Sequence, residues 1–223
     1  MTFSIVARCA RTGQFGMAIS SSSPAVAARC AHVRAGVGAV ASQNITDPAL
    51  GPLVLDRLEA GLDAAAALAA VTVGRAHIDY RQLLVIDRNG HTAIHSGAKV
   101  LGIWNEAQGK DCAAGANLLA NDAIPDRMVA AFEAAKGQLA ERLMQTLEVG
   151  LLAGGEAGPV RSAGLKVADR LSWPLVDLRI DWADAPIQML RAAWNSYAPQ
   201  MQAYVQRAEN PTQAPSYGVP GDE

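Results

Sequence analysis

The second residue of the chain, Thr2, is the residue with the most distinctive chemistry. A small residue in this position usually allows an aminopeptidase to remove Met1, which leaves threonine as the new terminus. One residue then carries both a hydroxyl nucleophile and an α-amine, whose reference pKa is about 7.7 to 8.0. The amine can take the hydroxyl proton during attack on an amide carbonyl and return it to the leaving amine. Hydrolysis of an amide or related carbonyl bond in a small metabolite is therefore the leading functional hypothesis.

The residues that follow Thr2 decide whether its reactive groups are held in place. Most threonines in second position belong to mobile chain ends. Here a β-prone run begins at Phe3 and continues to Cys9, which predicts a terminus fixed in a sheet. An anchored hydroxyl and amine are what the hypothesis requires.

Polar residues near predicted strand ends are the next candidates. Ser21 and Ser22 follow the second predicted strand, where a hydroxyl could bond the terminal amine or a substrate. Gln43 and Asn44 follow the third, and their amides suit an oxyanion or a substrate carbonyl. The structural alternatives are an ordinary serine loop before Pro24 and a turn that satisfies its own backbone groups.

His95 and Asn117 complete the candidate catalytic set. His95 ends a predicted strand in the triplet His95-Ser96-Gly97, although a buried histidine bonded to a backbone carbonyl is the common alternative. Asn117 follows a glycine-containing strand and is a candidate donor to an oxyanion. Its alternative role is a helix or turn cap.

Two arginines are candidates for substrate binding. The guanidinium groups of Arg81 and Arg161 could hold a substrate carboxylate in a bidentate pair. Structural ion pairs with nearby acids are the alternative for both.

Composition excludes several classes of partner and cofactor. A formal net charge of -2 and a pI near 6.1 give no electrostatic reason to expect nucleic acid or an anionic membrane. The histidines form neither HxxxH nor HxH pairs, so we expect no metal and no other cofactor. Cys9, Cys30 and Cys112 lack CxxC spacing, and no signal peptide or membrane-length apolar run is present. A cytoplasmic protein that acts on a small-molecule substrate is the expectation.

The order of predicted elements indicates the fold class. Two hairpins, each followed by a pair of helices, and two final strands suit helices layered outside largely antiparallel sheets. The predicted strands are residues 3–9, 15–20, 37–42, 82–86, 91–95, 111–116, 162–167 and 175–180. The sequence therefore predicts an α+β fold, a four-layer αββα sandwich.

Helix boundaries follow from capping residues. Asp47-Pro48 predicts the start of one helix, and Asp63 predicts the cap of the next. Two further helices are expected from Ile124 to Gly137 and from Leu139 to about Gly154, and a final one begins at Ala185-Pro186 and is interrupted at Pro199. We expect a single domain over residues 1–208 and a Pro-rich polar tail over 209–223.

Several short motifs together resemble a known family. They are Met1-Thr2-Phe3-Ser4-Ile5-Val6-Ala7, the Ala35 to Gln43 run, Asp47-Pro48 with Gly51, Arg81-Gln82-Leu83, His95-Ser96-Gly97, Gly115 to Leu119, and Ser162-Ala163. Across residues 1 to 181 the chain resembles the "domain of unknown function ten-twenty-eight" family, placed in the N-terminal-nucleophile (Ntn) hydrolase superfamily. The resemblance implies an αββα sandwich and a terminal nucleophile.

The chain departs from that superfamily's threonine members in one respect. Members such as the proteasome subunits couple the terminal threonine to a nearby lysine and aspartate, whereas this chain has no lysine before Lys99. Arg29 is placed to supply a fixed positive charge, but arginine is not a proton acceptor. The resemblance also implies an acid at the position of Glu156. This chain differs from the family pattern in the residues just before Ser162-Ala163, around Arg161. The α-amine would then have to act as the base.

Two other functions remain open at the level of sequence. One is a ligand-binding or assembly protein that keeps the hydrolase scaffold without catalysis. The other is a hydrolase that uses an internal serine with His95. The alanine-rich and leucine-striped helices could also cover a subunit interface, so a homodimer is expected.

Overall fold

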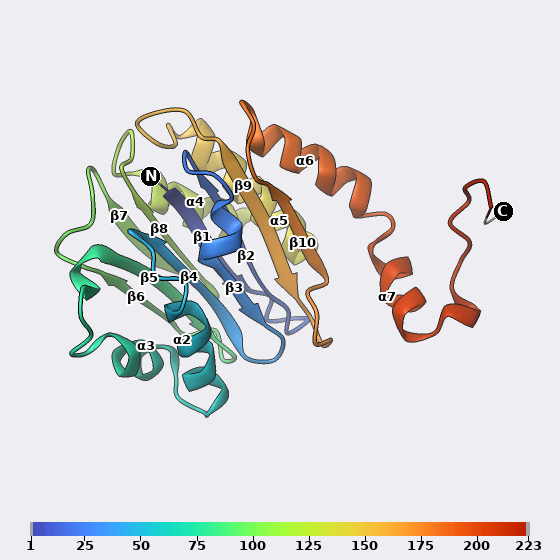
Figure 1. Cartoon of the computed structure of the whole chain (residues 1–223), viewed down its shortest axis with the longest axis horizontal. Helices are drawn as coiled ribbons and strands as arrows, with labels where there is room; N and C mark the ends of the chain where they lie inside the picture. Colours follow the sequence, from blue (N-terminus) through green and yellow to red (C-terminus); the bar gives the residue numbers. More distant parts are fainter. Residues whose placement is uncertain (1, 222–223) are drawn as a thin grey trace.

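Two antiparallel β-sheets pack face to face, and helices cover the outer face of each sheet (Figure 1). This computed structural model describes residues 2–221 of the 223 in the chain. The predicted removal of Met1 and the last two residues of the predicted tail lie outside the described residues. The layers are the αββα arrangement expected from the sequence, which is confirmed.

The larger sheet has six strands and contains the start of the chain at its centre. In spatial order its strands are β10 (Val176–Ile180), β9 (Ser162–Ala168), β2 (Phe15–Ser21), β1 (Thr2–Arg8), β8 (Cys112–Asn117) and β7 (Asn105–Gly109). Strand β1 pairs with β2 on one side and with β8 on the other. Both ladders engage the backbone from the second or third residue onward, so the beginning of the chain is a central strand.

The smaller sheet has four strands, each joined to the next along the chain. They are β3 (Ala31–Arg34), β4 (Gly38–Asn44), β5 (Arg81–Asp87) and β6 (Thr92–Ser96). The helical elements are α1 (Val26–Cys30), α2 (Leu50–Glu59), α3 (Ala64–Thr72), η1 (Ile78–Tyr80), α4 (Ile124–Ala134), α5 (Leu139–Leu152), α6 (Pro186–Tyr197), α7 (Met201–Glu209) and η2 (Pro211–Gln213).

Alternation along β1 separates the two faces of the larger sheet. Phe3 and Ile5 point to the outer layer, where they pack with residues of α4, α5 and α6. Val6 points to the inner layer, where it joins residues of β2, β4 and β5. Because successive side chains of a strand point to opposite faces, Thr2 and Ser4 share the inner face with Val6. The candidate nucleophile therefore lies between the sheets.

The outer face of the smaller sheet is covered by α2 and α3. Leu50 and Leu58 from α2 and Leu68 from α3 bury themselves against Val40 and Leu83. The N-terminus of α3 is capped as predicted, because the side chain of Asp63 accepts from the Ala66 N–H at 2.8 Å.

The helix predicted at Asp47-Pro48 begins later than expected. Helix α2 starts at Leu50 with Ala49 as its N-cap, and the Asp47 carboxylate accepts from the Ala49 N–H at 3.1 Å. Asp47 thus closes a turn ahead of the helix rather than capping it. Ser21, predicted to follow the second strand, is the last residue of β2.

Five short elements were not predicted from the sequence: α1, β3, β7, η1 and η2. Strand β7 has the sequence Asn-Glu-Ala-Gln-Gly, which has little intrinsic strand propensity, and it forms because it pairs with β8 at the edge of the sheet. Tertiary pairing overrides local preference there.

Helix α6 packs against β9 and β10, whereas α7 and the residues after it extend away from the sheets (Figure 1). The predicted interruption at Pro199 separates α6 from α7. Glu209, assigned to the tail from the sequence, is the last residue of α7 and pairs with Arg170, with Oε1 at 2.6 Å from Nη1. Among residues 2–221, no helix has the length and apolar content needed to cross a lipid bilayer.

We expect the replacement Gly38→Ala to destabilise the protein by about 1 to 3 kcal/mol. A Cβ at this position would lie 2.3 Å from the backbone oxygen of Ile86 on the neighbouring strand, which cannot move without opening the ladder. Urea unfolding measures the effect. Gly115→Ala is the matched control, because its Cβ would meet only the flexible Leu84 side chain at 3.0 Å. Equal losses in the two variants would contradict this account.

Candidate functional site

Four polar residues form a row across the inner face of the larger sheet, at the end where the chain begins. In register they are Ser162 on β9, Ser21 on β2, Thr2 on β1 and Asn117 on β8. All four are buried, with Thr2 4% exposed. Paired residues of antiparallel strands carry their side chains on the same face, so the Thr2 hydroxyl has polar neighbours on both sides.

The Thr2 hydroxyl begins a chain of hydroxyl groups that ends at a cation. Thr2 Oγ1 lies 3.4 Å from Ser21 Oγ, which is long for such a bond, and Ser21 Oγ lies 2.8 Å from Ser23 Oγ. Ser23 Oγ also accepts from Arg29 Nη2 at 3.2 Å. Arg29 therefore stands at the end of this serine relay and not beside Thr2, so it does not occupy the place of a catalytic lysine.

A network of buried side-chain amides lies under the row, and a backbone carbonyl fixes which atom of each amide is the donor nitrogen and which is the acceptor oxygen. Gln43 Nε2 donates to the carbonyl oxygen of Gly115 at 3.0 Å, and a carbonyl oxygen can only accept. The same nitrogen donates to Gln82 Oε1 at 2.8 Å, so that atom of Gln82 must be the oxygen. Asn117 reaches the same oxygen at 3.2 Å and must present its nitrogen, Nδ2.

The orientation of this network leaves Asn117 Oδ1 without a hydrogen bond among the described residues, although the atom is buried. A buried acceptor without a donor costs about 1 to 3 kcal/mol, so its presence calls for an explanation. Its register partner is Thr2. The unused atom is an acceptor, which does not suit the oxyanion role expected for Asn117.

Gln43 is also unsuited to the oxyanion role expected from the sequence. Both of its N–H groups are engaged, one by Gln82 and one by Gly115, and its Oε1 accepts from Ser4 Oγ at 2.6 Å. The side chain is fully buried. Gln43 holds the two sheets together and has no donor to offer a substrate.

Glu156 is a site residue that sequence reasoning noted but did not select. It lies in the loop after α5, and it is only 5% exposed. Both carboxylate oxygens accept from the backbone N–H of Ser22, at 3.0 and 3.1 Å. Burial raises the pKa of the Glu156 carboxyl from an ordinary 4.5 to about 7, against the hydrogen bonds from Ser22 that lower it.

The position of Glu156 follows from the strands on either side of β1. Its backbone forms a β-bridge with Leu119, two residues beyond the end of β8, and its carboxylate bonds Ser22, one residue beyond the end of β2. Strand β1 lies between β2 and β8. Glu156 therefore links the ends of the two strands that flank the start of β1.

The remaining candidates lie at the same end of the sandwich but engage the protein itself. Asn44 Nδ2 donates to the Tyr80 carbonyl at 2.6 Å, and the Arg81 guanidinium bonds the carbonyl of Ile45. The Arg161 guanidinium pairs with Asp184. The Arg161 contact is the structural ion pair considered as its alternative, whereas Arg81 bonds a backbone carbonyl rather than an acid and Asn44 bonds a segment outside its own turn.

His95 faces away from the row. It pairs with Leu83, whose side chain packs in the outer layer, whereas Gln82 next to it reaches the inner layer. His95 Nε2 lies 3.3 Å from the carbonyl of Ile78. Within residues 2–221, no hydrogen bond joins this ring to a serine hydroxyl, and the alternation of the strand keeps it on the opposite face from Ser96.

Of the nine candidates, the structure brings Thr2, Ser21, Ser22 and Asn117 together. Ser23 and Gln82 belong to the same assembly and were not selected as candidates, although Gln82 stands in the Arg81-Gln82-Leu83 motif. Within the described residues, no group of three or more His, Cys, Asp or Glu side chains is arranged to hold a metal ion.

The raised pKa of Glu156 predicts a pH-dependent stability. Because the folded protein holds this proton at higher pH than the unfolded chain, the stabilisation is complete below about pH 4.5 and is lost as the pH rises through 7. The wild-type protein should therefore lose up to about 3 kcal/mol between these values relative to Glu156→Gln. Chemical unfolding over this pH range measures the difference.

The control is Asp122→Asn, which removes an exposed carboxylate. It makes the same change in net charge at an exposed position, so it reports the effect of removing one carboxylate by charge alone. Parallel curves for the wild-type protein and Glu156→Gln would contradict the assignment.

The solved structures that match this chain include a member of one family at high structural similarity and two more distant proteins. The crystal structure of protein SPO2555 from Silicibacter pomeroyi, described with the family DUF1028, matches with a TM-score of 0.86 at 27% identity, over 92% of this chain and 90% of that one. Anbu (ancestral beta-subunit) from Yersinia bercovieri matches with a TM-score of 0.40 at 12% identity, over 91% of this chain and 97% of that one.

An Anbu (Gly-1) mutant from Hyphomicrobium sp. strain MC1 gives a TM-score of 0.39 at 12% identity, over 98% and 100% of the two chains. Scores this low carry no argument about this chain. A search of curated proteins gives no match. Residues 2–190 match the description "Family of unknown function (DUF1028)". The match spans most of the chain, and the protein therefore belongs to the DUF1028 family.

Proposed function

We propose that this protein is a hydrolase of amide or related carbonyl bonds in a small molecule, with Thr2 as its nucleophile once Met1 is removed. The observation that carries the proposal is the arrangement around Thr2. Its hydroxyl lies in a buried polar row on a central strand, with an unused acceptor, Asn117 Oδ1, beside it. A buried carboxylate, Glu156, lies beyond the strand end.

The α-amine of Thr2 is the base in this mechanism. Removal of Met1 converts the amide nitrogen of Thr2 into an amine that needs acceptors when it carries a proton. The proposal assigns to that nitrogen two acceptors, Asn117 Oδ1 on the residue paired with Thr2 and the Glu156 carboxylate at the ends of the flanking strands. The amine takes the proton of the Thr2 hydroxyl as Oγ1 attacks the carbonyl carbon, and passes it to the leaving group.

Glu156 tunes this base. An ionised carboxylate favours the protonated amine, whereas a neutral carboxyl favours the free amine. Since the pKa of Glu156 is raised to about 7 and the reference pKa of an α-amine is about 7.7 to 8.0, the proposal has the two groups exchange protons in overlapping pH ranges. Glu156 is thus a positioning residue in the proposal, and Thr2 is the catalytic one.

The serine relay orients the hydroxyl. Ser21 and Ser23 connect Thr2 Oγ1 to the Arg29 guanidinium through a series of hydroxyl contacts. The positive charge of Arg29 favours negative charge on the oxygens of the relay. Arginine keeps its proton at any physiological pH, so Arg29 acts by charge alone. Ser22 contributes its backbone N–H to Glu156.

We further place the protein in the N-terminal-nucleophile superfamily as part of this proposal. The support is the resemblance of its motifs, the αββα layering and the position of Thr2. Thr2 begins a central strand of the larger sheet and faces the space between the two sheets. Function depends on the site rather than the fold, so the chemistry of Thr2 has to be tested directly.

A non-catalytic scaffold is the second candidate, and one observation favours it. Thr2 is only 4% exposed, and it does not line the cavities described near this end of the sandwich. A cavity of about 230 Å³ adjoins Glu156 instead, and it is smaller than the usual ligand pocket of roughly 300 to 1,000 Å³. A protein without catalysis would tolerate a blocked terminus.

The deciding experiment compares two forms of the same chain, one that begins at Thr2 and one whose Thr2 nitrogen stays acylated by a fused N-terminal tag. A β-lactone, which acylates nucleophilic hydroxyl groups, serves as the probe because it needs no knowledge of the substrate. We expect the chain that begins at Thr2 to be acylated on that residue. The acylated form should react more slowly by about 10² or more, since it lacks the base.

Intact mass and peptide mapping report the label. Thr2→Ala is the control that should not be labelled, and His95→Ala should be labelled like the wild-type chain because His95 faces the opposite layer. Absence of label on a chain that begins at Thr2, or equal labelling of Thr2→Ala, would remove the proposed nucleophile and favour the non-catalytic scaffold.

A further inference from the structure

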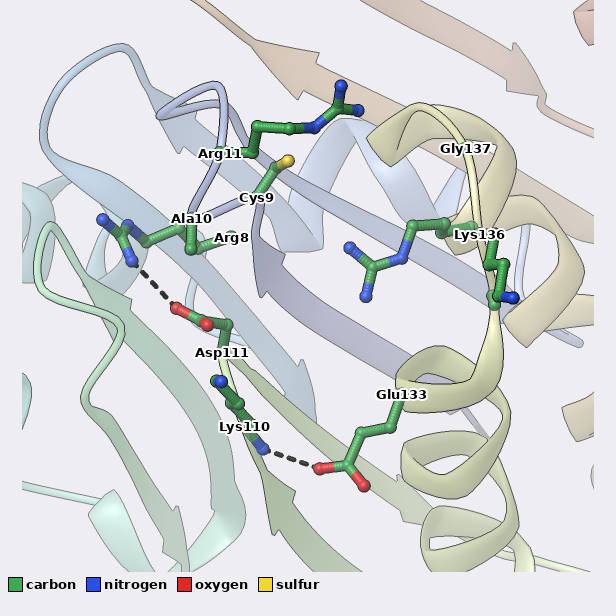
Figure 2. Close-up of a pocket in the computed structure, with 11 residues that line it drawn as sticks. Arg8, Cys9, Ala10, Arg11, Lys110, Asp111, Glu133, Lys136 and Gly137 are labelled. Carbon is green, nitrogen blue, oxygen red and sulfur yellow. Dashed lines mark hydrogen bonds and ion pairs between the residues drawn. The ribbon is translucent and has the colours of Figure 1, made fainter.

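A second cavity lies at the opposite end of β1 from Thr2. It has a volume of about 600 Å³ and is formed by the β1–β2 hairpin, the β7–β8 turn and the loop between α4 and α5 (Figure 2). Arg8 and Cys9 line it where β1 ends. At about 3.4 Å per residue, Arg8 lies roughly 20 Å from Thr2 along the strand. The two locations are separate sites.

The lining of this cavity is strongly positive. Its charged side chains are Arg8, Arg11, Lys110, Lys136, Arg142, Asp111 and Glu133. Five cations against two acids leave an excess of three positive charges, in a protein whose formal net charge is -2. Such a concentration of one sign of charge in a hollow attracts the opposite sign.

Both acids of the lining are already engaged. Asp111 Oδ1 accepts from Arg8 Nη1 at 2.9 Å, and Glu133 Oε1 accepts from the backbone N–H of Lys110 at 2.8 Å (Figure 2). Among residues 2–221, no ion pair joins Arg11, Lys136 or the other two cations of the lining, Lys110 and Arg142, to a carboxylate. Four positive charges around one hollow therefore have no ion-pair partner in the described part of the chain.

In each of two guanidinium groups at this cavity, one nitrogen lacks a hydrogen bond. The Nε atoms of Arg8 and Arg142 are buried and have no acceptor among the described residues. Arg142 is held in place by the Phe132 carbonyl, which accepts from Nη2 at 3.0 Å, and by the Phe132 ring, 3.9 Å from the guanidinium carbon. With the orphan acceptor on Asn117, these are the three such atoms of the described chain, and both orphan donors lie here.

We propose that this cavity binds a small dianion, a phosphate ester or a dicarboxylate. Planar guanidinium groups pair with the oxygens of either anion, and two negative charges would neutralise most of the local excess. The volume suits a small molecule. The site is independent of the proposed hydrolase chemistry, and it gives the protein a second ligand of its own.

Cys9 provides a local reporter for this site. Burial raises the pKa of the Cys9 thiol, but hydrogen bonds from Thr12 and Arg11 and the charge of Arg142 outweigh burial, and the pKa is lowered overall. Burial raises the pKa of Cys30 to about 11 and that of Cys112 to about 12. The thiolate is the reactive form, so iodoacetamide should modify Cys9 first.

The binding test uses inorganic phosphate and succinate as probes, with chloride at equal ionic strength as the reference. Calorimetry and thermal unfolding of the full chain should show binding of a dianion above the chloride reference, and the bound anion should slow alkylation of Cys9. Binding of phosphate alone indicates a phosphoryl ligand, succinate alone a dicarboxylate ligand, and both a general dianion site. Binding of neither overturns the proposal.

Charge reversal at exposed positions separates the site from bulk charge. The pair Arg11→Glu with Lys136→Glu should weaken binding by about tenfold or more, which corresponds to about 1.4 kcal/mol. The matched control, Arg57→Glu with Arg179→Glu, makes the same change in net charge at exposed positions outside the cavity and should keep the affinity. Equal weakening in both pairs would overturn the proposal, whatever the result at Thr2.

Discussion

The pairing of β1 with β2 on one side and β8 on the other is the constraint on which both candidate sites depend. The two ladders bury the backbone of the first strand and fix which of its side chains face the inner layer. At one end they hold Thr2 in a polar row, and at the other they place Arg8 and Cys9 beside a cationic hollow. Because both ladders fix β1 along its length, neither end of the strand can move without the other.

The amide network between the sheets has a direction because one backbone carbonyl, that of Gly115, accepts only. From that atom the roles of Gln43, Gln82 and Asn117 follow one after another. Buried polar networks are costly when incomplete, so a single unused acceptor at the end of this one marks a place where a donor is needed. The proposed terminal amine of Thr2 meets that need.

The two ends of β1 lack opposite kinds of partner, a hydrogen-bond donor near Thr2 and an acceptor near Arg8. Near Thr2 the unused atom is an acceptor and the neighbouring buried group is an acid, Glu156, which suits a positively charged amine. At the other end the unused atoms are donors on Arg8 and Arg142, among cations without partners, which suits an anion. Opposite electrostatic demands on one strand argue for different occupants.

The sequence by itself determined the layered fold, the cap at Asp63 and the anchored position of Thr2, because local propensity and hydrophobic alternation act between near neighbours. It did not reveal strand β7, whose formation depends on the edge of β8. Glu156 lies 154 residues beyond Thr2 along the chain, and only the closure of the loop after α5 onto the ends of β2 and β8 brings it to the strand. The donor and acceptor atoms of the buried amides and the net charge of the cavity lining also depend on contacts between residues far apart in the sequence. The tertiary structure alone therefore decided them.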